Sequence, residues 1–325
     1  MDVLSDVLQM IRLQGAFFLN AEFGAPWCLD APSDADWAPV LLPGARHLVI
    51  AHLVIEGQCW IEVPGTPAQE LRDGDIAMLP HGQAHRLGCG GTGPARSEDA
   101  VTLDLPELTP RHFGGQGAAC HVASAWFAYD HQVPNPLMLA LPQLVVTNIA
   151  RRPNGPWLSQ SVAHALEQAA AGPPGSGVIA GRVAEALFVE ALRGHLEALP
   201  PLQTGWLAAL RDPHIGRCLT LMHDSPAHGW TVRELALQVG MSRSVLAQHF
   251  TERLGMPPMQ YLKRWRLAAA ARLLGNQRIS LSQVAETVGY DSEASFNRAF
   301  KSIYGVAPGL WRRKGAPQRD LAFPT

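Results

Sequence analysis

Two ten-residue stretches in the C-terminal part of the chain repeat the same order of polar and apolar positions. The first reads T231-V-R-E-L-A-L-Q-V-G240 and the second S280-L-S-Q-V-A-E-T-V-G289, so that every position is offset by 49 residues. Each copy begins with a capping-box pair, Thr231 with Glu234 and Ser280 with Gln283. Each then runs for about two helical turns and ends at a glycine, which tolerates the left-handed conformation of a tight turn.

A second helix is predicted after each glycine, over Ser242 to Arg253 and over Ser292 to Ile303. The repeat continues there at an offset of 50, through the pairs Phe250 and Phe300, Gly255 and Gly305, Pro258 and Pro308, and Tyr261 and Trp311. Between the copies, the pattern over Gln260 to Leu274 predicts one long helix with the basic residues Lys263, Arg264, Arg266 and Arg272. The pattern therefore predicts two helix-turn-helix units joined by a helix.

The distribution of charge indicates what kind of partner this repeat binds. Residues 205–325 carry 16 Lys and Arg against 8 Asp and Glu, whereas residues 1–204 carry 10 against 20. A basic half favours a polyanionic partner, and recognition helices suit successive major grooves, which lie about 34 Å apart on one face of DNA. The alternative is a helical bundle that binds protein or only packs.

The segment from Trp206 to Arg313 resembles the DNA-binding domain of the AraC/XylS transcription regulators. Its second unit, VAETVGYDSEASFNRAFKSIYGVAPGLWRR, is similar to the family signature over nearly its whole length. In the family, the exposed face of each recognition helix contacts the groove. The resemblance implies DNA-contacting positions at Arg243, Ser244, Ala247 and Gln248 in the first unit, and at Glu293, Ala294, Asn297 and Arg298 in the second.

Side-chain chemistry refines these assignments. Gln248 suits adenine and Arg298 suits guanine, each through two hydrogen bonds, while Arg243 near a helix start can hold a phosphate. The two alanines offer only apolar contact to a thymine methyl, and Glu293 either accepts from cytosine or lies off the DNA. A solvated surface charge is the alternative for either arginine. The residues expected in the core are Val245, Leu246, Phe250, Phe296 and Phe300.

Short strands are predicted in the N-terminal half, over His47 to Glu56, Cys59 to Val63, Ile76 to Leu79, Val101 to Leu105 and Ala119 to Ala128. The turns at Gly57-Gln58, Pro64 to Pro67 and Asp73-Gly74 separate the earlier ones. Strands at such close spacing are typical of a barrel or sandwich. The fold class is thus multi-domain α+β: a β-barrel, a helical connector and an all-α domain with two helix-turn-helix units.

The stretch from Gly74 to His85, GDIAMLPHGQAH, matches the second cupin motif, G-x5-P-x-G-x2-H, and LVIEG at Leu53 to Gly57 resembles the end of the first. Residues 15–135 therefore resemble the cupin-type sensor domain of many AraC-family regulators. The acidic metal ligand of the cupin enzymes falls at Ile50, and its two preceding histidines fall within the Pro43-Gly44-Ala45-Arg46 segment. With three of four ligands missing, neither a metal, another cofactor nor an enzymatic activity is expected.

Strand alternation places His52 on the same side as position 50, which faces inward in cupins. His52 and His85 are then expected to line an effector pocket with Trp60 or Trp27 nearby. Packing histidines in a filled barrel are the alternative.

The five cysteines are odd in number and form no C-x-x-C pair, which favours a reducing cytoplasm over a disulfide scaffold. An exposed thiol of low pKa would sense oxidants, and Cys28 and Cys120 are the first candidates. A buried small apolar side chain is the alternative for each.

Two helices are predicted before a Pro-rich linker at Pro200 to Thr204: Asn154 to Ala171, and the amphipathic Gly177 to Leu199. The apolar face of the second consists of Val178, Val183, Leu187, Leu192, Leu196 and Leu199. The family resemblance implies that such helices dimerise, and packing on the barrel is the alternative. The expected domains are residues 1–150 (barrel), 151–204 (connector) and 205–318 (DNA-binding), with a tail at 319–325.

The sequence predicts a cytoplasmic, sequence-specific transcription regulator, with activation as the commoner mode of the family. Its expected partners are double-stranded DNA, a small effector, RNA polymerase and a second copy of the chain. No membrane is expected, because the N-terminus lacks a basic segment and prolines interrupt the apolar stretch Val133 to Ala150. A cupin enzyme with a DNA-anchoring domain and a constitutive DNA-binding protein with an inert barrel remain as alternatives.

Overall fold

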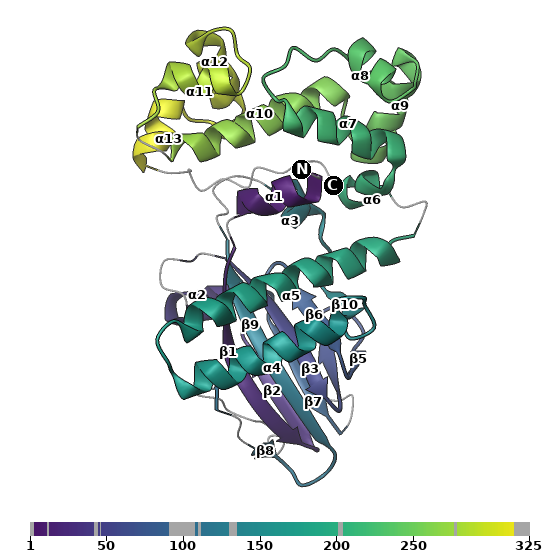
Figure 1. The fold of residues 1–325 in the computed structure, drawn as a ribbon, viewed down its shortest axis with the longest axis vertical. Helices are drawn as coiled ribbons and strands as arrows, with labels where there is room; N and C mark the ends of the chain where they lie inside the picture. Colours follow the sequence, from purple (N-terminus) through teal and green to yellow (C-terminus); the bar gives the residue numbers. More distant parts are fainter. Residues whose placement is uncertain are drawn as a thin grey trace. The chain divides into compact units, whose positions relative to one another are not determined.

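The computed structural model describes residues 3–11, 13–41, 45, 47–90, 108–109, 112–129, 135–200, 204–275 and 278–314. The chain groups into two compact units (Figure 1). One is β-rich and comprises Leu13–Tyr129 with Leu141–Ala198. The other is helical and comprises Met1–Arg12, Asp130–Ala140 and Leu199–Thr325. The multi-domain α+β class is as predicted.

The β-rich unit contains two sheets, a short helix α2 (Asp34–Leu41) and a pair of longer helices near its C-terminal end. The six-stranded sheet has the order β10 (Val145–Asn148), β6 (Asp75–Leu79), β3 (Leu48–Glu56), β9 (Ala119–Ala128), β1 (Gln14–Gly24), β8 (His112–Gly114). The four-stranded sheet has the order β2 (Trp27–Ala31), β7 (His85–Cys89), β4 (Gln58–Glu62), β5 (Gln69–Arg72). The predicted barrel is thus two sheets that face each other across a core and not one closed sheet.

Apolar side chains from alternating positions of both sheets fill the space between them. Phe23 and Trp27 stack there with ring centroids 4.2 Å apart, and Ile50, Val54 and Ile61 are fully buried in the same cluster. The strand predicted over Ala119 to Ala128 is present as β9. The strands predicted to begin at His47, Cys59 and Ile76 are present as β3, β4 and β6, with ends that differ by at most one residue. The strand predicted over Val101 to Leu105 lies outside the described residues.

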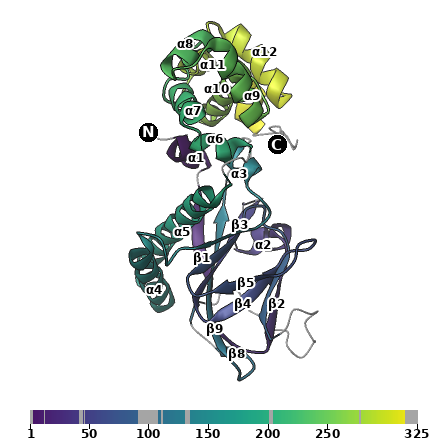
Figure 2. The ribbon, with the colours of Figure 1, turned by 90° about the vertical axis from the view of Figure 1, so that its right-hand side faces the viewer.

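Helices α4 (Gly155–Ala171) and α5 (Ser176–Ala198) form a hairpin that packs on the β-rich unit through α5 (Figure 2). Two glycines let α5 approach the six-stranded sheet closely. A Cβ at Gly181 would lie 2.7 Å from the carbonyl oxygen of Gly15, and a Cβ at Gly194 would collide with the Thr147 side chain. The predicted connector is therefore part of the β-rich unit.

The predicted apolar face of α5 is wrong at its start, because Val178 is 69% exposed. Val183 and Leu196 are only partly buried, while Leu187 and Leu192 are buried as predicted. Small residues such as Ala184 and Ala191 occupy much of the buried face instead. A hydrophobicity pattern gives little weight to such residues, although close packing of a helix on a sheet requires them.

The helical unit contains the repeat that the sequence predicts. After α6 (Trp206–Arg211) and α7 (Pro213–Asp224), the first unit consists of α8 (Val232–Gln238) and α9 (Arg243–Leu254). The long α10 (Pro258–Leu274) leads to α11 (Leu281–Thr287), α12 (Glu293–Tyr304) and α13 (Pro308–Lys314). The turn glycines Gly240 and Gly289 have φ of +70° and +85°, as the prediction requires.

Hydroxyl side chains cap all four helices of the repeat. Ser280 and Gln283 form the complete capping box, with both hydrogen bonds in place. The first box is only half formed: Thr231 accepts from the Glu234 amide, but the Glu234 carboxylate accepts from His228 Nε2 at 2.7 Å. The competing histidine, three residues before the cap, explains this difference from the prediction.

Two short helices from the N-terminal half belong to the helical unit. Helix α1 (Val3–Ile11) packs against α7, and α3 (Pro136–Ala140) packs against α6. Val7 is fully buried, and Asn135 Nδ2 donates to the Val7 carbonyl oxygen at 3.2 Å. The compact units thus divide the chain differently from the expected boundary at residue 150.

Replacing Gly194 by Ala should destabilise the β-rich unit by about 1–3 kcal/mol, because the added methyl group collides with Thr147. The matched control is Gly177→Ala on the same helix, where a Cβ meets nothing within 4 Å. This control should leave stability unchanged or raise it by less than about 1 kcal/mol. Urea unfolding measures both, and equal effects of the two substitutions would contradict the close packing of α5.

Candidate nucleic-acid interface

Helix α9 presents its first turn to solvent. Ser242 caps the helix by accepting from the Val245 amide at 3.3 Å, while Leu246 and Phe250 anchor the opposite side in the core. Among the predicted contact residues, Arg243, Ser244 and Gln248 are exposed and Ala247 is half-buried. The helix therefore displays these four side chains along one surface.

The prediction that Val245 lies in the core is wrong. Its side chain is 52% exposed, although Leu246 beside it is fully buried. Adjacent helical positions point about 100° apart, so two consecutive apolar residues need not share an environment. Val245 thus adds an apolar side chain to the exposed surface of α9, where it can contact a thymine methyl group.

Helix α12 presents the second set at the same positions of the repeat. Glu293, Ala294 and Arg298 are exposed, and Asn297 is half-buried. The Oδ1 atom of Asn297 is buried and has no hydrogen-bond partner among the described residues. Lys301 follows Arg298 by one helical turn and is exposed too, which the helical spacing signals but the family pattern did not.

The two recognition surfaces differ in where their charged residues lie. Gln248 Nε2 donates to Glu252 Oε1 at 2.8 Å on α9, so the amide must exchange this bond to contact a base. The positions that correspond to Gln248 and Thr251 on α9 are Arg298 and Lys301 on α12. Over their full lengths the two helices carry the same formal charge of +1, but the basic residues of α12 lie at positions 298 and 301, whereas α9 carries Arg243 at its start, where α12 has Glu293.

Asp212 fixes α9 against α7. Its carboxylate accepts from the amides of His214 and Ile215 at 3.0 Å, as the N-cap of α7, and from His249 Nε2 of α9 at 2.7 Å. Burial alone would raise the pKa of Asp212, but the Ile215 amide and His249 outweigh it and lower the pKa. The carboxylate thus stays ionised and holds the recognition helix in place.

In the β-rich unit, the predicted pair His52 and His85 does come together. His52 lies on β3 of one sheet and His85 on β7 of the other, and their Nε2 atoms are 2.7 Å apart. His85 Nδ1 donates to the Gln83 carbonyl oxygen at 2.9 Å, so His85 Nε2 accepts from His52. His52 Nδ1 then accepts from Ser124 Oγ at 2.6 Å. We call this chain the inter-sheet histidine bridge.

Both histidines of the bridge are neutral in the fold. Burial, followed by the proximity of His85, holds the pKa of His52 well below its ordinary value. Burial lowers the pKa of His85 to about 4, although the bond to Gln83 opposes the shift. The bridge is therefore a buried network with matched donors and acceptors.

Trp60 does not join this pair. Its neighbours on β4, Cys59 and Ile61, belong to the core cluster, so strand alternation places Trp60 on the opposite face of its sheet. There its ring lies 5.8 Å from the Arg86 guanidinium carbon. Trp60 therefore lies on the face turned away from the histidines, which differs from the expectation that it lines a pocket with them. Trp27, the other tryptophan considered, is in the core cluster.

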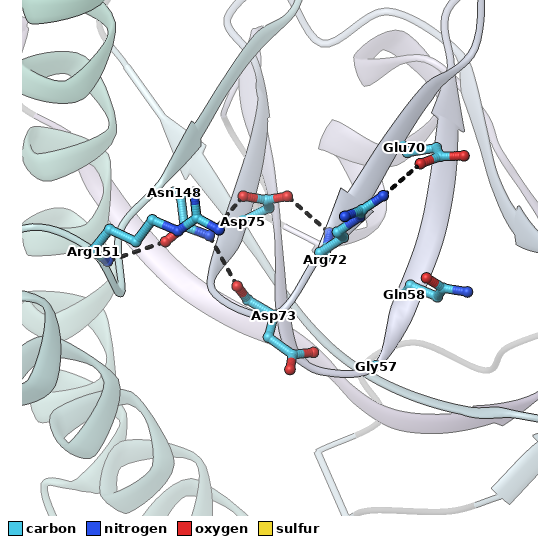
Figure 3. Close-up of a pocket in the computed structure, with 8 residues that line it drawn as sticks. All are labelled: Gly57, Gln58, Glu70, Arg72, Asp73, Asp75, Asn148 and Arg151. Atoms are coloured by element: carbon cyan, nitrogen blue, oxygen red, sulfur yellow. Dashed lines mark hydrogen bonds and ion pairs between the residues drawn. The ribbon is translucent and has the colours of Figure 1, made fainter.

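A pocket of about 770 Å³ lies elsewhere on the β-rich unit (Figure 3). The pocket is lined mostly by polar residues: Gly57, Gln58, Glu70, Arg72, Asp73, Asp75, Asn148 and Arg151. Neither histidine of the bridge belongs to this lining. The lining groups bond to one another, for example Asn148 Nδ2 to Asp75 Oδ1 at 2.8 Å. These bonds join β10 to β6 and to the turn before it.

The two cysteines considered for redox sensing are buried, Cys28 at 3% and Cys120 at 1% exposure. The thiol neighbour of Cys120 is Cys59, whose pKa is raised by a hydrogen bond to Cys120 and then by burial. A raised pKa keeps a thiol protonated and unreactive. Burial thus favours the small-apolar interpretation of Cys28 and Cys120.

Across the described ranges, which omit positions 43, 44 and 46, no group of three or more His, Cys, Asp or Glu side chains is placed to hold a metal ion. Among the helices that the structure describes, none is long and apolar enough to cross a membrane.

Two capped recognition helices on a basic helical unit, in one chain with a two-sheet cupin fold, define a DNA-binding transcription regulator. A family model described as Cupin matches residues 2–197, and one described as Helix-turn-helix domain matches residues 235–314. An AraC-like transcription regulator of Streptomyces lividans is 31% identical over 96% of this chain and 98% of the relative. The chain belongs to the AraC family of transcription regulators, with an N-terminal cupin domain.

One more full-length relative agrees with this assignment. The transcriptional regulator AlkR of Acinetobacter baylyi is 28% identical over 97% of this chain and its own full length. The solved DNA-binding domain of AdpA in complex with a target DNA is 26% identical. It covers 31% of this chain and 90% of its own, with a TM-score of 0.30.

The inter-sheet histidine bridge predicts a pH dependence of stability. Because the folded pKa values of His52 and His85 lie below the ordinary value of about 6.5, the unfolded chain binds more protons between pH 6.5 and 4. Stability should therefore be fully present above pH 6.5 and fall as the pH decreases, by up to about 1.4 kcal/mol per pH unit for each histidine. Urea unfolding at pH 7, 6 and 5 measures the slope.

The variant His85→Gln should show a shallower slope than the wild type, since one buried titrating group is removed. His164→Gln, which replaces an exposed histidine on α4, is the control and should retain the wild-type slope. An unchanged slope in His85→Gln would show that the bridge does not govern the acid sensitivity.

Proposed function

We propose that the chain is a sequence-specific regulator that binds double-stranded DNA by placing α9 and α12 in successive major grooves. The observation that carries this proposal is that both exposed recognition surfaces belong to one compact unit and are joined by the single helix α10. The excess of basic residues after position 204 supports general affinity through counterion release. Transcription regulation implies RNA polymerase as a further partner.

Arginines of the two recognition helices test this proposal in different ways. Once bound sequences have been selected from random duplexes, Arg298→Ala should weaken binding by about 1–3 kcal/mol and relax the preference at one guanine. Arg243→Ala, at the start of α9, should instead weaken binding to all sequences and reduce the salt dependence, as expected for a phosphate contact. Fluorescence anisotropy on single-base variants of the site measures both.

Loss of affinity without any change in base preference for Arg298→Ala would exclude base recognition by this side chain. Absence of any selected sequence would overturn the proposal of sequence-specific binding itself.

The outer surface of the α4–α5 hairpin supports a homodimer. Trp157 is 62% exposed on α4, and Val178 and Ile179 are 69% and 54% exposed on α5. Apart from Glu167, α4 carries no Asp, Glu, Lys or Arg in its 17 residues, which is unusual for a solvated helix. Aromatic side chains and a low charge are typical of protein interfaces. We assign the occupant of this surface as a second copy of the chain.

Replacing Trp157 by Glu should convert a dimer into a monomer, because a charge would be buried without a partner at the interface. Sedimentation equilibrium measures the change in mass. Leu237→Glu is the matched control, since Leu237 is 71% exposed on α8 in the other unit, and it should leave the mass unchanged. A wild-type monomer at all concentrations would refute the dimer.

For the cupin domain we propose sensing of a small effector. The inter-sheet histidine bridge supports this, because a ligand that competes for its hydrogen bonds would change the pairing of the two sheets. Native mass spectrometry of the reduced protein tests it: a retained organic mass, reduced in His52→Leu, supports sensing. A bound metal would favour the alternative of a cupin enzyme. A clean apo mass, with DNA affinity unaffected by candidate small molecules or mild oxidation, would indicate constitutive binding.

A further inference from the structure

The side chain of Arg266, in the middle of α10, contacts backbone from both helix-turn-helix units. Its Nε donates to the Pro226 carbonyl oxygen at 2.6 Å, and its Nη2 donates to that of His228 at 2.7 Å. Both carbonyls belong to the loop before α8, in the first unit. Its Nη1 donates to the carbonyl oxygen of Gly289 at 3.2 Å, in the turn of the second unit.

The turn of the second unit also lies directly on the loop of the first. A Cβ added to Gly289 would lie 2.7 Å from Ala227 Cα and 3.0 Å from the Arg266 guanidinium carbon. Gly240, the equivalent residue of the first unit, has nothing within 4 Å of such a Cβ. The two turns share a sequence pattern and a positive φ, but only that of Gly289 contacts the other unit.

Guanidinium chemistry suits this position. The planar group offers five N–H donors in a fixed fork, so three carbonyl groups bound to it have fixed positions relative to one another. Hydrogen bonds from a charged donor are about twice as strong as neutral ones. A lysine ammonium at the same place carries no such fixed geometry.

We propose that Arg266, Gly289 and Ala227 form a joint that fixes the separation and angle of α9 and α12, and so sets the number of base pairs between the two DNA segments that one protomer recognises. Arg266 is thus a positioning residue and not a DNA contact. The inference rests on the proposed function, in which both helices enter successive grooves. Each inserted base pair shifts the second segment by about 3.4 Å and rotates it by about a tenth of a turn, which a rigid pair of helices cannot follow.

The test compares Arg266→Lys with the wild-type full-length chain on duplexes whose two segments are at the selected spacing or have one base pair inserted. Fluorescence anisotropy gives Kd for each duplex. For the wild type, one insertion should raise Kd by about tenfold or more, comparable to one mismatched base pair. For Arg266→Lys, binding at the selected spacing should weaken, and the penalty for insertion should shrink to about threefold or less, because preorganisation is lost. Arg272→Lys, the same change at an exposed position of α10, is the control and should keep the wild-type penalty.

A second pair of variants keeps the test decisive if Arg266→Lys folds poorly. Gly289→Ala and Gly240→Ala introduce the same positive-φ strain, but only the first places a methyl group against Ala227. Gly289→Ala should reduce the penalty for insertion, and Gly240→Ala should not.

A structural role alone would weaken binding equally at every spacing, so an unchanged penalty in Arg266→Lys and in Gly289→Ala overturns the joint. If wild-type affinity does not depend on spacing, the joint and the two-groove proposal fail together. If the affinity of the wild type depends on spacing and that of both variants depends on it equally, the joint is refuted and the two-groove proposal stands.

Discussion

Helix α10 is the element on which the DNA-binding unit depends, because its two ends lie in different hydrophobic cores. Near its start, Tyr261 packs edge-on against Phe250 of α9, and Trp265 stacks on His223 of α7 with centroids 3.4 Å apart. Towards its end, Leu267, Ala270, Ala271 and Leu274 join the cluster formed by α11, α12 and α13. A helix-turn-helix unit of about 25 residues cannot bury its apolar face alone, so each unit completes its core on this shared helix. The same helix that stabilises both units therefore determines how they are related.

In the β-rich unit, the corresponding constraint is the relative position of the two packed sheets. Its core is mostly apolar and non-directional, and such a core tolerates small shifts. The inter-sheet histidine bridge adds direction, since the Ser124, His52, His85 and Gln83 groups match only in one arrangement. A satisfied polar network of this kind specifies a single packing, and a shift of either sheet leaves a buried polar group unpaired. The packing of the two sheets is thus coupled to one buried polar network.

Much of this structure follows from local sequence signals. Caps and turn glycines act within a few residues, so the limits of the helices in the repeat and the positive φ of Gly240 and Gly289 could be predicted. Strand alternation placed His52 beside His85 because both positions could be aligned to a motif. It could not be applied to Trp60, because no motif position on β4 indicates which of its faces lies inside.

Other features depend on contacts between distant segments. Val245 is exposed and Leu246 buried, which only the placement of α9 against its neighbours decides. The close approach of Gly181 to Gly15, and the three carbonyls around Arg266, join residues that are far apart in the sequence. The positions proposed to contact DNA follow from the family pattern and from exposure. Helix capping and the packing of the opposite helix face explain why these side chains are exposed, but they do not determine which bases would be contacted.

The assignment of α1 and α3 to the helical unit has a topological consequence. The chain passes between the two compact units at four places, after residues 12, 129, 140 and 198, and not only through the segment before α6. A fragment that begins after residue 198 would lack the helix that covers α7 and would expose apolar surface that is buried in the whole chain. The C-terminal half by itself thus lacks part of the packing that it has in the whole chain, and four chain connections link the two units.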